Sequence, residues 1–157
     1  MRRVISIKVE NKSGVLARVA GLFSARGYNI DSLTVSETEH ADISVMTVVV
    51  TGDDRVLEQV KKQLNKLIDV IKVTDHSEYP SVQRELALVK TNIHASKRSE
   101  IFQIAEIFRA EIVDISLKSI TLEVTGEPEK IDNFIELLKP YTIRELIRTG
   151  RISMTKE

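Results

Sequence analysis

The stretch VISIKVENKSGVLARVAGLF, residues 4–23, decides how the first half of the chain folds. Apolar and polar side chains alternate from Val4 to Val9, which is typical of a strand with one buried face. From Val15 onward the apolar residues recur at the spacing of a helix that buries one side. The turn between these runs, Asn11–Leu16, therefore joins a strand to a helix.

This turn has the features of a site for an anion. The start of a helix exposes backbone N–H groups at the positive end of its dipole, which suits a carboxylate or a phosphate. Ser13 is the expected N-cap, and Gly14 lets a ligand approach the backbone closely. Val15 and Leu16 place apolar atoms beside the site, so a branched amino acid would fit. An ordinary capped turn is the alternative that these residues leave open.

The rest of the first half continues the alternation of strands and helices. Gly27 ends the first helix where a left-handed residue normally stands. Two strands follow, joined by a polar hairpin loop at Glu37–Asp42. A second helix opens at Gly52–Asp54, and Val70–Thr74 closes the unit as a short strand. The order βαββαβ predicts a ferredoxin-like unit, in which a four-stranded antiparallel sheet carries both helices on one face.

The second half repeats this order with a different sequence. A polar segment with the chain's first proline, His76–Ser81, reads as a tether, and strand and helix patterns follow it in the same succession. We therefore expect an α+β protein of two ferredoxin-like units, with residues 1–76 and 83–157 as domains and 77–82 as the tether. The turn of the second unit, Asn92–Ser99, has no glycine and carries more charge, so we expect this unit to dock to a partner.

Composition excludes several classes of protein. The chain has 157 residues, 42% of them hydrophobic, and 23 basic residues balance 23 acidic ones, so nothing favours a nucleic acid or an anionic membrane as partner. It has no cysteine, and its three histidines are far apart and expected at the surface, so no metal site is predicted. No apolar run is long enough to span a membrane, and we expect a cytoplasmic protein. No motif unites a nucleophile, a base and a metal, so no catalytic residue is expected.

Together these segments resemble the ACT domain, a ferredoxin-like module that binds small effectors. The block RGYNID, residues 26–31, extends the similarity to a narrower family, the small regulatory subunits of acetohydroxyacid synthase (acetolactate synthase). This resemblance covers nearly the whole chain and is strongest up to about residue 90. The segments that carry it are Arg2–Val9, Asn11–Val19, Gly21–Val35, Met46–Thr47, Leu57–Leu64, Arg84–Lys90 and Glu106–Arg109.

The resemblance implies a function and partners. Subunits of this family bind the catalytic subunit, raise its activity and make it sensitive to valine, the end product of a branched-chain amino-acid pathway. The catalytic partner is expected to use thiamine diphosphate, FAD and Mg²⁺, whereas this chain binds no cofactor. In the family the effector lies where two ACT domains meet edge to edge, with the turn of one chain facing the start of the second strand of the other, which implies a homodimer.

The resemblance also implies an effector site with three parts. Backbone N–H groups of the turn meet the carboxylate of valine, two asparagine side chains bind or orient its ammonium group, and apolar side chains line its isopropyl group. The residues are Gly14, Val15 and Leu16 for the N–H groups, Asn11 and Asn29 for the ammonium group, and Ile30 with Val15 and Leu16 for the isopropyl group.

Three other functions share this topology. An ACT-type amino-acid sensor acting on a different enzyme fits the same residues. A small acid-phosphate hydrolase would need an arginine in the first turn, where the only charge is Lys12. An RNA-binding sheet would need aromatic residues on its central strands, where this chain has isoleucine, valine and leucine. Leucine and isoleucine remain competing effectors, because one methylene changes binding by only about 1–3 kcal/mol.

Overall fold

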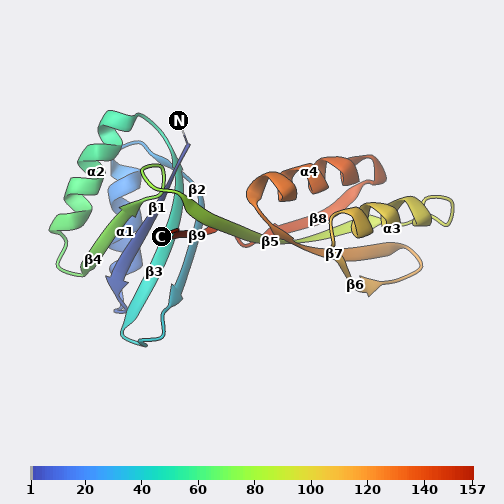
Figure 1. Cartoon of the computed structure of the whole chain (residues 1–157), viewed down its shortest axis with the longest axis horizontal. Coiled ribbons are helices and arrows are strands. Elements are labelled where there is room, and N and C mark those ends of the chain that lie inside the picture. Colours follow the sequence, from blue (N-terminus) through green and yellow to red (C-terminus); the bar gives the residue numbers. More distant parts are fainter. Residues whose placement is uncertain (1) are drawn as a thin grey trace. The chain divides into compact units, whose positions relative to one another are not determined.

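A computed structural model describes residues 2–157 of the chain (Figure 1). Its contacts divide the chain into two compact units. The first unit contains the residues up to Val82 together with Arg151–Glu157, and the second contains Gln83–Gly150. No helix of the described residues is long and apolar enough to cross a membrane.

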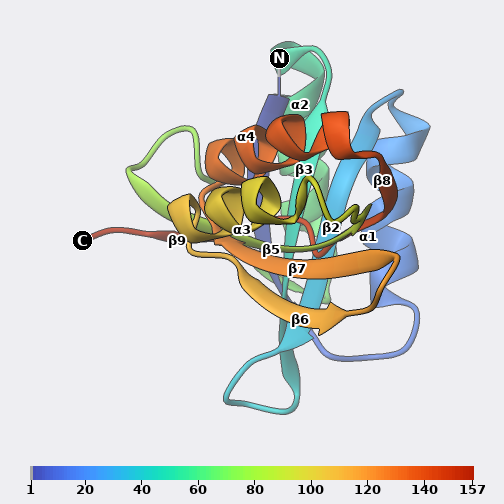
Figure 2. The ribbon, with the colours of Figure 1, turned by 90° about the vertical axis from the view of Figure 1, so that its right-hand side faces the viewer.

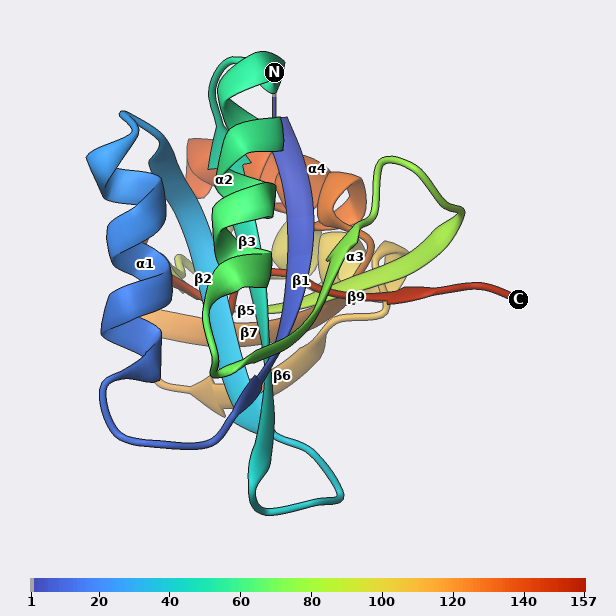
Figure 3. The same ribbon diagram turned by 90° about the vertical axis from the view of Figure 1, so that its left-hand side faces the viewer.

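The first unit has the predicted βαββαβ order. Its elements are β1 (Arg2–Glu10), α1 (Val15–Ala25), β2 (Asn29–Glu37), β3 (Ile43–Thr51), α2 (Asp54–Lys66) and β4 (Val70–Asp75). The strands pair antiparallel in the order β2-β3-β1-β4, and both helices cover one face of the sheet (Figure 3). Alternate residues of β1, such as Ile5 and Ile7, are buried with Val19 and Phe23 of α1 and Leu57 of α2. The ferredoxin-like prediction is therefore confirmed for this unit.

The end of α1 shows how local sequence sets this architecture. Gly27 has a φ of 78°, in the left-handed region that favours glycine, as predicted. Its N–H donates to the carbonyl of Ser24 at 3.2 Å, and the N–H of Tyr28 donates to the carbonyl of Phe23 at 3.0 Å. These two bonds form a Schellman motif, and the rings of Phe23 and Tyr28 pack edge to face, 6.5 Å apart.

Tyr28 also explains a glycine at the start of α2. Its ring is buried against Gly52, and its hydroxyl donates to the carbonyl of Asp53. A Cβ atom added at Gly52 would overlap the tyrosine ring.

We expect Gly52→Ala to lower the free energy of unfolding by about 2 kcal/mol in urea titrations, since the ring must move out of a packed core. The control is Gly21→Ala on α1, where an added Cβ meets nothing within 4 Å; it should gain stability by roughly 0.5–1 kcal/mol. Equal effects of the two changes would contradict this account.

The face of this sheet without helices is also covered. Val4, Thr47 and Val49 are buried there, and Thr34 Oγ1 donates to the carbonyl of Arg151 at 3.4 Å. His76 is buried on this face too, beside Ser6 Oγ, and burial lowers the pKa of its imidazole. The expectation that all three histidines lie at the surface is wrong for His76.

The last seven residues of the chain explain part of this burial. Arg151–Glu157 belong to the first unit, where the N–H of Lys156 donates to the carbonyl of Pro80 at 2.9 Å. Within this segment β9 (Ile152–Thr155) pairs with β5 (Ser81–Asn92), so β5 begins inside the expected tether. The structure therefore differs from the expected domain division in two ways: β5 begins within residues 77–82, and residues 151–157 belong to the first unit. The pairing of β9 with β5 joins residues that are far apart in the chain, so no local sequence pattern predicts it.

The second unit repeats the same order around its own core. After β5 come α3 (Arg98–Ile107), β6 (Glu111–Ile115), β7 (Ser119–Gly126), α4 (Pro128–Leu138), a short 3-10 turn (Lys139–Tyr141) and β8 (Ile143–Arg148). The strands follow the order β6-β7-β5-β8, and α3 and α4 lie on the same face of the sheet (Figure 2). Val89, Ile101, Leu122 and Phe134 are buried between these layers, which confirms a second ferredoxin-like unit.

Candidate functional site

The turn between β1 and α1 is built around a left-handed glycine. Gly14, not Ser13, occupies the N-cap position of α1, with φ 85° and ψ −10°, and no side chain among residues 2–157 caps the helix. The prediction of Ser13 as N-cap is therefore wrong. The left-handed conformation of Gly14 turns the chain into the helix. The helix therefore begins through a backbone conformation and not through a capping hydroxyl group.

Backbone N–H groups of this turn are available to an anion. Among the described residues no acceptor is present for the N–H groups of Ser13 and Gly14, and that of Val15 has only a long bond of 3.4 Å to the carbonyl of Lys12. The N–H of Leu16, in the first helical turn, has no partner within the helix. The first turn of α1 contains no acidic residue, so nothing in the helix start competes with an incoming carboxylate.

Asn11 ties this turn to the hairpin loop between β2 and β3. Its backbone N–H donates to the carbonyl of Asp42 at 2.7 Å, and its side-chain Nδ2 donates to the carbonyl of Ala41 at 2.9 Å. The amide is thereby oriented with its donor end toward the protein. Its Oδ1 receives no hydrogen bond within residues 2–157 and remains able to accept one from an ammonium group.

The three predicted apolar residues differ in exposure. Val15 is buried in the core with a 2% exposed fraction, and Ile30 is half-buried against the same core. Leu16 is 44% exposed on the outer side of α1. Within one chain, Leu16 is therefore the residue of the three that presents most of its side chain to a ligand.

The structure separates the predicted residues into two groups. Asn11, Gly14, Val15 and Leu16 lie together after Glu10, at one end of the sheet. Asn29 and Ile30 begin β2 at the opposite end, because Asn29 pairs with Thr51 and Thr51 pairs with Arg2. At about 3.3 Å per residue the two ends of β1 are roughly 25 Å apart. One chain therefore does not bring Asn29 to the turn.

Asn29 belongs to a small polar cluster of its own. Its Nδ2 donates to Asp31 Oδ1 at 2.7 Å, while Asp31 Oδ2 accepts from Thr51 Oγ1 at 2.6 Å and from Arg2 Nε at 3.3 Å. The hydrogen bond from Thr51 lowers the pKa of Asp31, helped by Asn29 and Arg2 and opposed by partial burial. Sequence reasoning assigned no role to Asp31. A carboxylate two residues from the predicted asparagine was the available signal.

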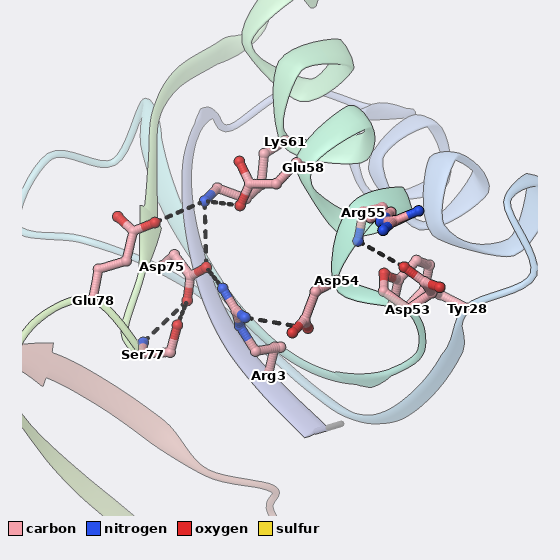
Figure 4. Close-up of polar contacts among 10 residues, drawn as sticks. All are labelled: Arg3, Tyr28, Asp53, Asp54, Arg55, Glu58, Lys61, Asp75, Ser77 and Glu78. Atoms are coloured by element: carbon pink, nitrogen blue, oxygen red, sulfur yellow. Dashed lines mark hydrogen bonds and ion pairs between the residues drawn. The ribbon is translucent and has the colours of Figure 1, made fainter.

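A second polar cluster lies between α2 and β4 (Figure 4). Glu58, Asp75 and Glu78 bring carboxylate oxygens within 4.8 Å of one another, close enough to hold a metal ion. The ammonium group of Lys61 bonds to all three, at 3.1, 3.3 and 3.2 Å respectively. A protein cation thus takes the place where a metal would be held, and we assign no metal to this cluster.

Asp75 is the buried centre of that cluster. Its side chain is 0% exposed and accepts from the guanidinium of Arg3, from Lys61, and from the N–H and hydroxyl of Ser77. Burial alone would raise the pKa of Asp75, but the bonds from Arg3 and Ser77 outweigh it and lower the pKa to about 2. The cluster therefore stabilises the ionised carboxylate and ties β1 and α2 to β4.

The fold and the turn together define an ACT-type protein with a second ferredoxin-like unit. Residues 5–72 match the family model of the AHAS small subunit-like ACT domain, and residues 84–157 match that of the small subunit of acetolactate synthase. The chain belongs to the acetolactate synthase small subunit family. The predicted resemblance is therefore confirmed.

Relatives of this family match over almost the full length. A probable acetolactate synthase small subunit of Archaeoglobus fulgidus is 54% identical, with 99% of this chain and 98% of that protein covered. The acetolactate synthase small subunit of Aquifex aeolicus is 50% identical, covering 99% of this chain and 82% of that protein. The crystal structure of the acetolactate synthase small subunit from Thermotoga maritima superposes with a TM-score of 0.88. The two sequences are 41% identical, and the match covers 100% of this chain and 98% of that chain.

Proposed function

We propose that this chain is the regulatory subunit of an acetolactate synthase, which activates the catalytic subunit and makes it sensitive to feedback inhibition by valine. The observation that carries the proposal is the turn of the ACT domain, where a left-handed Gly14 leaves backbone N–H groups without acceptors. The catalytic partner, in the cytoplasm, supplies thiamine diphosphate, FAD and Mg²⁺, and this chain contributes no catalytic residue.

A homodimer would complete the site. β2 is an edge strand of the first sheet, so its outer side is open to another strand. If β2 pairs antiparallel with β2 of a second copy, the start of one strand lies beside the end of the other. Glu37 at the end of β2 pairs with Ser44, at the same end of the sheet as the turn after Glu10. The second copy's β2 would therefore bring an asparagine equivalent to Asn29 toward this turn.

Such a site suits the zwitterion of an amino acid. Burying either charge is costly unless it is paired, and here the two charges would meet different partners. The N–H groups of the turn, at the positive end of α1, would bind the carboxylate, and the Oδ1 atoms of Asn11 and of the second copy's asparagine would accept from the ammonium group. Leu16, together with the second copy's residue equivalent to Ile30, would face the isopropyl group.

Feedback requires that valine stabilise one arrangement of the complex over another. A ligand held between two copies does this, because its affinity depends on how the copies are arranged. We propose that the second unit docks to the catalytic subunit, and that the ACT dimer transmits the state of its site through that contact.

Reconstitution with the catalytic subunit of the same organism tests the function. We expect the full chain to co-purify with that subunit, to raise acetolactate formation, and to make it inhibitable by valine. Copurification without activation or inhibition would remove the regulatory role. Failure to bind this subunit, with valine still bound by the chain alone, would instead indicate a sensor for another enzyme.

Asn29→Ala tests the site itself. We expect valine binding by the full chain, measured by calorimetric titration, to weaken roughly 10- to 100-fold, because a hydrogen bond to a charged group is worth about 1.5–3 kcal/mol. The matched control is Asn65→Ala, an exposed asparagine of α2 outside both groups of site residues, which should leave binding unchanged. Equal affinity of Asn29→Ala and the unaltered chain would exclude Asn29 from the site.

A further inference from the structure

Asp31 controls which end of the Asn29 amide faces outward. An ionised carboxylate can only accept hydrogen bonds, so the contact of 2.7 Å between Asp31 Oδ1 and Asn29 must be made by the amide nitrogen. The Oδ1 atom of Asn29 is then directed away from Asp31. No other described residue donates to it, and the residue is exposed at the start of the edge strand β2.

Asp31 is itself held in place across three strands. Its Oδ2 accepts from Thr51 on β3 at 2.6 Å and from Arg2 on β1 at 3.3 Å, and its side chain is only 22% exposed. The sheet is irregular at this point, because the pairing of β2 with β3 shifts between Ile30 and Ser32. The residue between them, Asp31, is the extra residue of this bulge, and bulges commonly redirect a side chain.

We infer that Asp31 is a positioning and specificity residue: it locks Asn29 as a hydrogen-bond acceptor, so that the site takes amino acids and rejects 2-oxo acids of the same carbon skeleton. This inference rests on the proposed valine site. An ammonium group only donates, and it pairs with the Oδ1 atom that Asp31 turns outward. A keto oxygen only accepts, and the locked amide presents its own oxygen, not its NH2 group, to that atom. A free asparagine could rotate its amide and serve either ligand.

The distinction matters chemically for a feedback site. An amino acid and the 2-oxo acid from which transamination forms it share a carboxylate and an apolar side chain, so those parts cannot tell them apart. Only the α substituent differs. Leaving a buried polar group without a partner is what makes discrimination of this kind large.

The test compares Asp31→Ala with Asp31→Asn in the full chain, by titration with valine and with 3-methyl-2-oxobutanoate. In Asp31→Ala we expect valine to bind about 10-fold more weakly, while the 2-oxo acid binds as well as before or better, so that the ratio of the two affinities falls at least 10-fold. Asp31→Asn keeps an oxygen that accepts from Asn29, provided that its amide nitrogen donates to the Thr51 hydroxyl, which then accepts instead of donating. It should retain valine affinity within about 3-fold.

Other outcomes separate the two proposals. If Asp31→Asn loses as much affinity as Asp31→Ala, a hydrogen-bond acceptor beside Asn29 is not what residue 31 supplies, and the positioning role is wrong. If Asn29→Ala weakens valine binding and Asp31→Ala does not, only the present inference fails. If Asn29→Ala binds valine normally, the proposed site fails and takes this inference with it. In the double variant Asn29→Ala/Asp31→Ala, the losses of valine affinity seen in the two single variants should not add, because Asp31 acts through Asn29.

Discussion

Gly14→Asp is expected to abolish inhibition by valine, raising the concentration needed for half-inhibition at least 100-fold, while activation of the catalytic subunit is retained. The aspartate carboxylate would lie among the backbone N–H groups that are proposed to bind the carboxylate of valine. Two like charges in a partly desolvated site repel by several kcal/mol. The measurement is the valine dose response of the reconstituted complex.

The matched control separates charge from strain. Gly14 has φ 85°, and asparagine and aspartate are the side-chain-bearing residues that tolerate this conformation best. An added Cβ would lie 3.1 Å from Arg18 Nη1, an atom at the end of a flexible side chain, so both variants should fold. We expect Gly14→Asn to weaken inhibition only about 10-fold. Persistent valine inhibition in Gly14→Asp would refute the placement of the carboxylate at this turn.

Arg3→Met should produce the largest loss of stability, about 3 kcal/mol in urea titrations at neutral pH. It removes the cation closest to Asp75, whose side chain is fully buried, and breaking one partner of a buried pair leaves a charge poorly compensated. Lys61→Met is the control, because Arg3 and Ser77 would still hold Asp75. It should cost about 1 kcal/mol. If Arg3→Met unfolds at the same urea concentration as the unaltered chain, the cluster adds nothing to stability.

The ion pair of Arg3 with Asp75 also makes the stability of the fold depend on pH. The pKa of Asp75 is about 2 in the folded chain, below its ordinary value of 3.8. A lowered pKa adds stability that is complete above pH 4 and is lost as pH falls from about 4 to 2, here about 2 kcal/mol. In Arg3→Met the pKa of Asp75 should rise and most of this dependence should disappear. His76 acts in the same direction at higher pH, because its lowered pKa removes stability as pH falls below 6.5.

Local sequence patterns were sufficient to predict the helices and strands and the part of the candidate site that lies in the turn at Gly14. Alternation in β1, helical spacing in α1 and the left-handed Gly27 each depend on neighbours along the chain, and all three were predicted. The turn at Gly14 was also found, although its cap was assigned to Ser13. Serine and glycine are both favoured N-cap residues, and the backbone conformation that decides between them is not visible in the residue types.

The sequence by itself determined two βαββαβ units, a turn suited to an anion, and membership in a family. These follow from periodicity and from short motifs, which act over a few residues. Only the tertiary structure placed Asn29 at the far end of the sheet from Gly14, joined it to Asp31 and Thr51, and returned Arg151–Glu157 to the first unit. Strand register and long-range pairing decided these contacts, because they join residues far apart in the chain whose local patterns are independent of one another.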